Sequence, residues 1–147
     1  MTPTNMPVDM ASDDLIEIVV VGAHLSGMPL NGELTSRGAA FRRIVQTTPD
    51  YRLHALAGGP PKRPGLIRVA SGTGAAIACE VWALPPAGFG TFVAGIPSPL
   101  GIGTLRLADG TTPKGFLVET EGLIGAEDIT AHGGWRAYIA SLSGAAA

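Results

Sequence analysis

Glycine and proline recur so often along this chain that only short regular elements fit between them, and this spacing constrains the fold more than any other feature. The chain has 21 glycines and 12 prolines in 147 residues, a high proportion for a helical protein. Several segments between them are apolar and rich in β-branched residues, which favours strands joined by turns. Residues 15–21 (LIEIVVV) are the clearest example, because they stop at Gly22, and we predict a central strand there.

Other strands are predicted where short apolar runs end at glycine or proline. They cover residues 51–57, 66–69 and 75–84, and a hairpin pairs 102–107 with 115–119 around an Asp109-Gly110 turn. Residues 58–65 (GGPPKRPG) contain three prolines and three glycines and are not expected to form regular structure.

Few helices are expected. Residues 33–45 are predicted to contain a short helix, with Thr35 as its N-cap and an apolar side made of Phe41, Ile44 and Val45. Residues 89–94 fit either a short helix or a strand, and residues 126–142 hold a helical stretch interrupted by two glycines. Many strands and few helices predict an α+β domain with a small closed or half-closed sheet.

The chain length fits one domain, which we place at residues 14–147, behind a flexible leader at residues 1–13. The leader lacks the basic start and the long apolar run of a signal peptide. No apolar run approaches the roughly 20 residues of a membrane helix. The single cysteine, Cys79, rules out an internal disulfide and is compatible with the cytoplasm, which is the location we predict.

Composition also argues against several classes of function. The formal net charge is −2 and no basic stripe is present, so nucleic-acid binding is not expected. Three widely spaced histidines and one cysteine do not form a zinc pattern. The sequence has neither a phosphate-binding P-loop nor the G-x-S-x-G motif of hydrolases, so no metal and no cofactor are predicted.

The loop after the first predicted strand is the main candidate for a binding site. A glycine-bearing turn presents successive backbone N–H groups that suit a carboxylate, and a histidine in it can transfer a proton near neutral pH. The alternative is an ordinary tight turn whose histidine caps a backbone carbonyl. The candidate residues of this loop are Gly22, Ala23, His24, Leu25, Ser26 and Asn31.

Two further cationic positions are candidates for binding an anion. Arg63 lies in the proline-stiffened loop, where the alternative is a solvated surface charge. Arg136 follows Trp135, and this pair either walls a pocket or anchors the last helix. Ser26 lies near His24, but no acid in the sequence is placed to orient a serine nucleophile. Glu80 is either a buried acid or an outward-facing residue of a strand, and outward is the default.

Six segments together resemble the C-terminal domain of allophanate hydrolases, over roughly residues 16 to 142. They occur in the family's order and are residues 19–41 (VVVGAHLSGMPLNGELTSRGAAF), 51–69 (YRLHALAGGPPKRPGLIRV), 80–85 (EVWALP), 89–110 (FGTFVAGIPSPLGIGTLRLADG), 115–119 (GFLVE) and 128–138 (DITAHGGWRAY). The resemblance implies the gamma-glutamyl cyclotransferase-like fold, a small β-barrel with flanking helices. It does not imply cyclotransferase activity. The catalytic glutamate of cyclotransferases would fall in residues 92–100, which contain no acid. The Y-G-S/T-L-x-x-G loop of cyclotransferases falls on residues 21–27, where Val21 takes the tyrosine position and His24 takes the leucine position.

The resemblance also implies a chemistry. In full-length allophanate hydrolases an amidase domain releases ammonia, and the C-terminal domain is understood to decarboxylate the product, N-carboxycarbamate. A histidine in the first loop matters for that step, and His24 matches it. The expected function is therefore decarboxylation of N-carboxycarbamate, or of a related ureido or amido acid, in urea and allophanate catabolism. The expected partners are a small carboxylate-bearing substrate, an amidase and a second copy of the chain. The alternative function is a non-catalytic assembly or regulatory module for an amidase.

Overall fold

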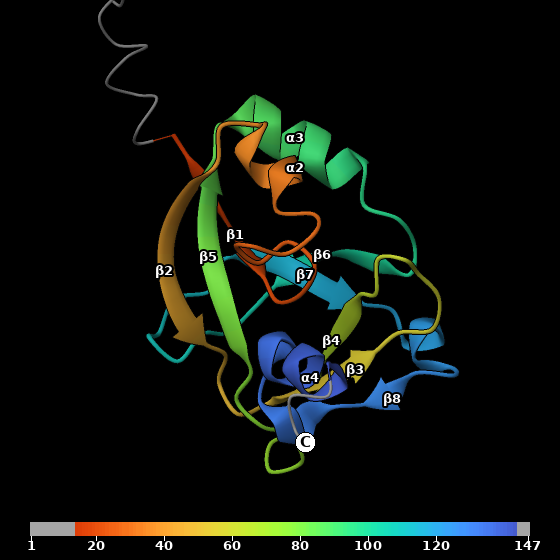
Figure 1. The fold of residues 1–147 in the computed structure, drawn as a ribbon. Helices are drawn as coiled ribbons and strands as arrows, with labels where there is room; N and C mark the ends of the chain where they lie inside the picture. Colours follow the sequence, from red (N-terminus) through yellow and green to blue (C-terminus); the bar gives the residue numbers. More distant parts are fainter. Residues whose placement is uncertain (1–13, 144–147) are drawn as a thin grey trace, which may run out of the picture.

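The computed structural model describes residues 14–143, so the leader predicted for residues 1–13 lies outside the described residues. Within this range the strands form two sheets (Figure 1). The larger sheet has the order β2-β5-β1-β7-β6 and consists of β1 (Ile16–Val20), β2 (Ala40–Gln46), β5 (Ala78–Leu84), β6 (Leu100–Thr104) and β7 (Lys114–Val118). The smaller has the order β4-β3-β8 and consists of β3 (Tyr51–Ala55), β4 (Pro64–Arg68) and β8 (Glu127–Asp128).

The helices are short and lie around the sheets. In Figure 1, α2 and α3 lie together at one end of the larger sheet, and α4 lies at the opposite end, beside the smaller sheet. They are α2 (Gly32–Thr35), α3 (Pro86–Ala94) and α4 (Trp135–Leu142), with the 3-10 turns η1 (Thr120–Leu123) and η2 (Thr130–His132). None of the helices between residues 14 and 143 has both the length and the apolar character needed to cross a membrane.

β1 lies at the centre of the larger sheet, as the sequence predicted. It pairs antiparallel with β5, where Val19 faces Val81, and parallel with β7, where Val19 faces Gly115. Ile18, Val19 and Val20 have no exposed surface, because side chains cover both faces of the strand. A run of consecutive β-branched residues is what a strand buried on both faces requires.

The α+β class is confirmed, whereas a closed barrel is not. β4 of the smaller sheet lies against β7 of the larger one, but no ladder of backbone hydrogen bonds joins them among the described residues. Both sheets therefore stay open within the described part of the chain. The 107–110 turn and the antiparallel pairing of β6 with β7 agree with the predicted hairpin.

The short helix predicted within residues 33–45 is present only at their start, as α2, and its predicted N-cap and apolar side are wrong. Thr35 is the last residue of α2 and not its N-cap, and the three apolar residues assigned to a helical face lie on β2. The cause is a bulge in β2: Phe41 faces Trp82 and Arg43 faces the next residue, Val81, which leaves Arg42 unpaired. The extra residue interrupts the alternation of apolar and polar side chains along β2. The apolar residues then lie three and four residues apart, which is the spacing typical of a helix.

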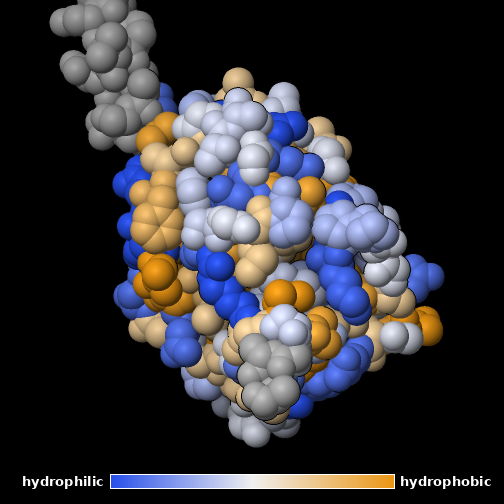
Figure 2. Space-filling view, in the orientation of Figure 1, coloured by the Kyte–Doolittle hydropathy of each residue, from blue (hydrophilic) through white to orange (hydrophobic). Residues whose placement is uncertain are grey.

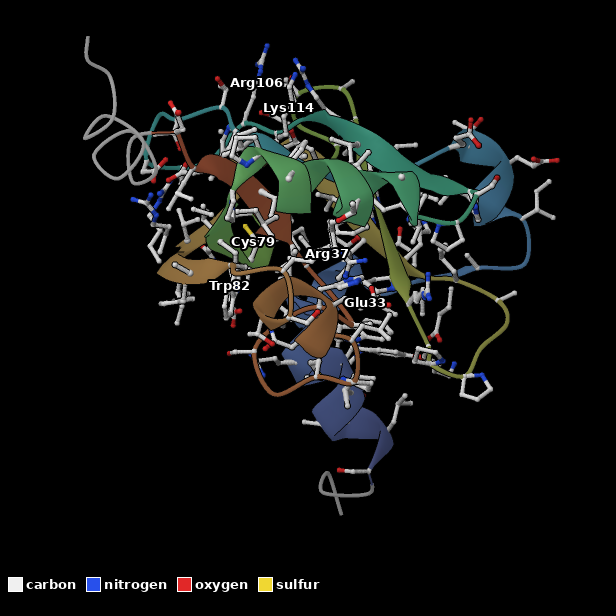
Figure 3. The ribbon with its side chains drawn as sticks, turned by 90° about the horizontal axis from the view of Figure 1, so that it is seen from above. Glu33, Arg37, Cys79, Trp82, Arg106 and Lys114 are labelled. Carbon is white, nitrogen blue, oxygen red and sulfur yellow. The ribbon has the colours of Figure 1, made fainter. Side chains whose placement is uncertain are left out.

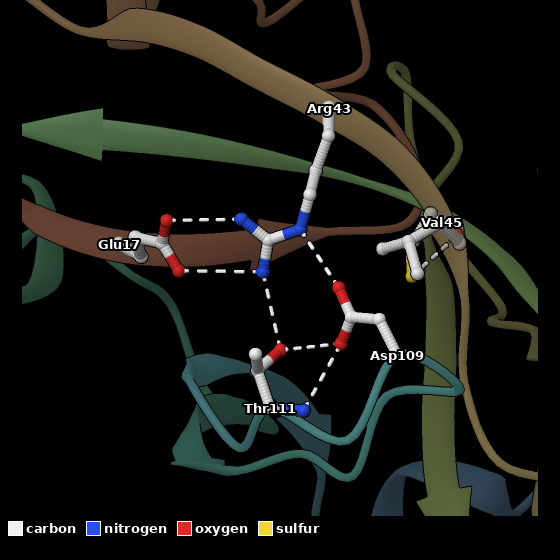
Figure 4. Close-up of polar contacts among 6 residues, drawn as sticks. Glu17, Arg43, Val45, Asp109 and Thr111 are labelled. Carbon is white, nitrogen blue, oxygen red and sulfur yellow. Dashed lines mark hydrogen bonds and ion pairs between the residues drawn. The ribbon is translucent and has the colours of Figure 1, made fainter.

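The edge of the larger sheet is fastened by an ionic cluster around Arg43 (Figure 4). Its guanidinium donates to Glu17 Oε2 on β1 at 3.0 Å, to Asp109 Oδ2 at 3.0 Å and to Thr111 Oγ1 at 3.1 Å. One side chain thus joins β2, β1 and the loop that follows β6. Nearby, the buried Cys79 thiol donates to the Val45 carbonyl, and burial raises the pKa of the thiol to about 12, so it stays protonated and unreactive.

Candidate functional site

His24 lies in the loop that follows β1, and the loop is closed by its own hydrogen bonds. The Leu25 N–H donates to the Gly22 carbonyl at 2.9 Å, and the Leu30 N–H donates to the Ala23 carbonyl at 2.8 Å. The Asn31 side-chain amide donates to the His24 carbonyl at 2.8 Å. Asn31 therefore shapes the turn around His24, and its amide is already engaged there.

The His24 ring is held by one carboxylate and two aromatic rings. Its Nε2 lies 2.7 Å from Glu33 Oε1, on α2. Phe116 of β7 stacks on the ring at a centroid distance of 5.1 Å, and Phe92 of α3 meets it edge-on at 5.0 Å. Because a carboxylate only accepts hydrogen bonds, Nε2 carries a hydrogen and donates it. The other nitrogen, Nδ1, has no hydrogen-bond partner among residues 14–143, and it is not among the fully buried unpaired atoms, so it keeps some exposed surface.

The surroundings of His24 lower its pKa below the ordinary value of 6.5. Burial is the largest cause, since a charged imidazolium is poorly solvated between two phenylalanine rings. The hydrogen bond and the charge of Glu33 act in the opposite direction, and the positive charges of Arg63 and Arg37 lower the pKa further. His24 is therefore mostly neutral at pH 7, and its protonated form is a stronger acid than a free histidine.

A cavity of about 120 Å³, called the His24 cavity here, opens beside this ring. It is lined by His24, Glu33, Arg37, Arg63, Phe92, Phe116 and residues 95–97. Figure 3 shows Glu33 and Arg37 next to each other, close to α3. Arg37 is fixed in place, because it donates to Thr91 Oγ1 at 3.0 Å and to the Glu33 carbonyl at 2.8 Å. With two arginines and one glutamate, the cavity carries a net positive charge when His24 is neutral.

Arg63 reaches the cavity from the loop before β4. Its guanidinium makes no hydrogen bond and no ion pair with any residue in the described part of the chain. Gly22 helps to bring this loop close, because a Cβ at Gly22 would lie 2.2 Å from the Cδ of Pro64. A second, water-sized space of about 20 Å³ lies between Gly22, Ala23 and Arg63. An unpaired guanidinium beside a cavity of net positive charge favours a small anion as the ligand.

Glu80 fastens the other side of the His24 loop. It is 4% exposed, so the outward orientation expected by default is wrong. Its carboxylate accepts from the Ser26 N–H at 2.9 Å, Ser26 Oγ at 3.0 Å, Trp82 Nε1 at 3.0 Å and Arg136 Nη2 at 2.8 Å. Arg136 also donates to the Ser26 carbonyl at 2.6 Å. This group, the Glu80 cluster, joins β5, the His24 loop and α4.

Most of the predicted site residues fall into two groups, whereas Asn31 shapes the turn around His24 without lining either space beside it. Gly22, Ala23, His24 and Arg63 line the His24 cavity or the small space beside it. Ser26 and Arg136 belong to the Glu80 cluster. Arg136 also lines a different cavity, of about 400 Å³. Leu25 is a buried core residue that lines the same cavity as Arg136.

Glu33 and Arg37 were not predicted as site residues. Their spacing of four residues, directly after the histidine loop, is the signal that could have found them, because α2 and the turn that follows it place Arg37 within hydrogen-bond distance of the Glu33 carbonyl. For a metal, residues 14–143 bring no three His, Cys, Asp or Glu side chains together.

The model of the allophanate hydrolase C-terminal domain family matches residues 16–140. Urea amidolyase of Saccharomyces cerevisiae is 42% identical over 130 residues, which are 86% of this chain and 7% of that protein. The allophanate hydrolase structure from Kluyveromyces lactis has a TM-score of 0.84 and 40% identity, over 87% of this chain and 21% of that one. The chain thus spans only a small part of these relatives.

Two further structures complete the comparison. A uropathogenic E. coli-specific protein of known structure has a TM-score of 0.78 and 34% identity, over 85% of this chain and 95% of that one. A gamma-glutamyl cyclotransferase structure is similar at a TM-score of 0.52 and 14% identity, which is a likeness of fold alone. The predicted cyclotransferase-like fold is therefore confirmed, together with the resemblance that implied it.

Proposed function

This chain belongs to the allophanate hydrolase C-terminal domain family, and we propose that it decarboxylates N-carboxycarbamate or a closely related ureido or amido acid during urea and allophanate breakdown. One observation carries the proposal. His24 has one ring nitrogen held by Glu33 and the other free, beside a small cavity flanked by Arg37 and Arg63. This arrangement suits a small dianion that must be protonated as it reacts.

The reaction needs a proton at nitrogen. When carbon dioxide leaves an N-carboxylate, the electron pair of the C–N bond stays on the nitrogen, and a proton delivered there lowers the barrier. In the mechanism we propose, protonated His24 donates a proton to the substrate nitrogen from Nδ1. The Nε2–H group keeps its hydrogen bond to the Glu33 carboxylate, and this bond fixes the ring orientation. Arg37 and Arg63 hold the carboxylates, and Phe92 and Phe116 keep water away from the ring.

The direct test supplies the unstable substrate with an enzyme. The purified chain is mixed with an amidase that acts on allophanate, and carbon dioxide release is followed in time. We expect the chain to accelerate the release beyond the rate with the amidase alone. Equal rates with and without the chain, under conditions where the amidase produces N-carboxycarbamate, would contradict the proposal.

The pH dependence follows from the pKa of His24. If the protonated form donates, kcat/KM is constant at low pH and falls as the pH rises through a midpoint below 6.5, because burial lowers the pKa. Glu33→Gln removes a charge that raises this pKa, so the midpoint moves to lower pH still. A bound dianion raises the pKa, so the midpoint in kcat lies above that in kcat/KM. A kcat/KM that instead rises with pH would assign His24 the role of a base.

Arg37 gives a second expectation, on binding. Arg37→Met keeps the length of the side chain but removes the charge, so the affinity for malonate, a stable dicarboxylate analogue, falls by about tenfold to a hundredfold. Arg42→Met on the exposed side of β2 is the matched control and leaves the affinity unchanged. Isothermal titration calorimetry measures both. Unaltered malonate binding by Arg37→Met would remove Arg37 from the site.

An assembly role is the second candidate function, and one surface favours it. Figure 2 shows apolar atoms gathered over β2, where Ile44 is 76% exposed and Phe41 is 47% exposed. Large apolar side chains side by side on a sheet surface are typical of a contact with another protein. Measuring the molecular size of the protein alone and with an amidase distinguishes the two candidate functions. An assembly module forms a complex with the amidase, and Ile44→Asp disrupts that complex. An independent enzyme forms no complex.

A further inference from the structure

The His24 cavity does not end at Arg63. Arg63 and Pro97 also line a second hollow of about 290 Å³, called the polar groove here. The polar groove runs between two loops, residues 56–61 before β4 and residues 97–100 before and at the start of β6. Because Arg63 and Pro97 line both spaces, the His24 cavity and the polar groove lie next to each other at these two residues.

The lining of the groove indicates what chemistry it accepts. Four of its residues are prolines (Pro60, Pro61, Pro97 and Pro99), and a proline has a carbonyl acceptor but no N–H donor. The Pro97 and Pro99 carbonyls already accept from the N–H groups of Leu100 at 3.0 Å and Glu119 at 2.9 Å, so the acceptors that remain are those of Pro60 and Pro61. Arg63 is the only charged residue in the lining. Gly58 and Gly59 take positive φ values of 100° and 112°, and their backbone groups make no hydrogen bond to other backbone groups among the described residues. Beyond a single cation, the groove thus offers the backbone groups of residues 58–61, which have no backbone partner among the described residues and include more carbonyl acceptors than N–H donors.

N-carboxycarbamate is too small to need the polar groove as well as the His24 cavity. It carries two carboxylates on one nitrogen, and a molecule of seven non-hydrogen atoms is of the size that the His24 cavity alone holds. From this we infer that the site also takes N-carboxylated amides or ureides with an uncharged, N–H-bearing chain, the carboxylated nitrogen lying at His24 and the chain lying in the polar groove.

This inference rests on the proposed function and leaves its chemistry unchanged. The substrate R–NH–CO2⁻ loses carbon dioxide as the C–N bond breaks, its electron pair stays on nitrogen, and the proton from His24 Nδ1 completes R–NH2. No oxidant, reductant or further reactant is needed. The groove changes only which R groups fit.

The test compares two stable monoanions with the same head. Malonamate has the carboxylate and one amide, and N-malonylglycinamide extends that amide by a chain that carries one further N–H-bearing group. We expect N-malonylglycinamide to bind about tenfold more tightly, the gain of about one net hydrogen bond from its terminal amide. In ¹⁵N NMR spectra of the full chain, both ligands shift the amide signals around His24, and only the longer one shifts those of Gly58, Gly59 and Ser98.

A groove-filling variant makes the test specific. Ser98 lines the polar groove and not the His24 cavity, so Ser98→Trp should abolish the preference for the longer ligand and leave malonamate affinity within about twofold. Ser71→Trp, in an exposed turn, is the control for adding a large aromatic side chain. Equal affinities for the two ligands, or a preference that survives Ser98→Trp, would overturn the inference.

The failures of the two proposals are distinguishable. If malonate binds at His24 and the chain accelerates carbon dioxide release, but the longer ligand gains nothing, then only the groove assignment is wrong. If neither malonate nor malonamate shifts any signal around His24 and carbon dioxide release is not accelerated, then the proposed function is wrong and the groove assignment falls with it.

Discussion

Replacing His24 with asparagine should lower the kcat for carbon dioxide release by about a hundredfold or more, the usual contribution of a positioned general acid. Asparagine cannot become a cationic proton donor, and the hydrogen bond from Nε2 to Glu33 is lost. The fold should survive, because the loop is closed mainly by backbone hydrogen bonds and by the Asn31 amide, which bonds to the backbone of residue 24. The measurement is the amidase-coupled assay, together with thermal unfolding.

His132→Asn is the matched control for this variant. His132 is an exposed histidine on η2, where its ring meets Tyr138 edge-on, and it does not line the His24 cavity. The His132→Asn variant should release carbon dioxide at the full rate of the unmutated chain. If His24→Asn accelerates carbon dioxide release as well as the unmutated chain does, the acid is another group, and the free Nδ1 has no chemical role.

Replacing Glu80 with alanine should lower the free energy of unfolding by about 2–3 kcal/mol, the cost of leaving hydrogen-bond donors without their acceptor. The change leaves the Ser26 N–H, the Trp82 indole N–H and part of the Arg136 guanidinium without an acceptor. Since Ser26 lies two residues from His24, carbon dioxide release should also fall, although Glu80 does not line the His24 cavity. Chemical denaturation measures the first effect.

Two controls accompany this prediction. Glu121→Ala, at an exposed position, should change the stability by less than about 0.5 kcal/mol. Glu80→Gln keeps most of the hydrogen bonds and should cost less than Glu80→Ala. An unfolding free energy of Glu80→Ala within about 1 kcal/mol of the unmutated value would show that the Glu80 cluster is not a structural tie.

The pH dependence of stability gives Glu80 a second signature. Burial alone raises the pKa of this carboxyl, but the hydrogen bonds from Trp82, Ser26 and Arg136 outweigh burial, so the pKa lies below the ordinary value of 4.5. The folded state therefore binds this proton less readily than the unfolded chain does. The resulting stabilisation is present above pH 4.5 and is lost as the pH falls through the folded-state pKa, and Glu80→Gln lacks it.

The sequence predicted the elements whose signals are local. β1 was predicted because consecutive β-branched residues end at glycine, and the β6–β7 hairpin because an Asp-Gly pair separates two apolar runs. β2 was missed because its bulge, a feature set by the pairing with β5, removes the alternation that marks a strand. Whether the sheets close was not predictable either, since closure depends on how β4 meets β7 in space.

The site shows the same division. His24 and Arg63 could be chosen from the sequence, because each lies in a loop marked by glycine or proline. Which charges meet is a matter of tertiary structure. Arg136 was expected to bind a carboxylate, and the structure pairs it with the carboxylate of Glu80 from the protein itself. Glu33 is brought to His24 only because the nine residues from one to the other fold back through the Leu30–Ala23 hydrogen bond.

The central place of β1 makes the site a late product of folding. β1 is the first strand among residues 14–143, yet its neighbours β5 and β7 come from residues 78–84 and 114–118. The loop behind it is completed only by Arg136, 110 residues after Ser26. Pairings between segments so distant in sequence form slowly, because the intervening chain must be ordered first. During synthesis His24 leaves the ribosome before Phe92 and Phe116, so it can gain its full set of neighbours only when most of the domain has followed it.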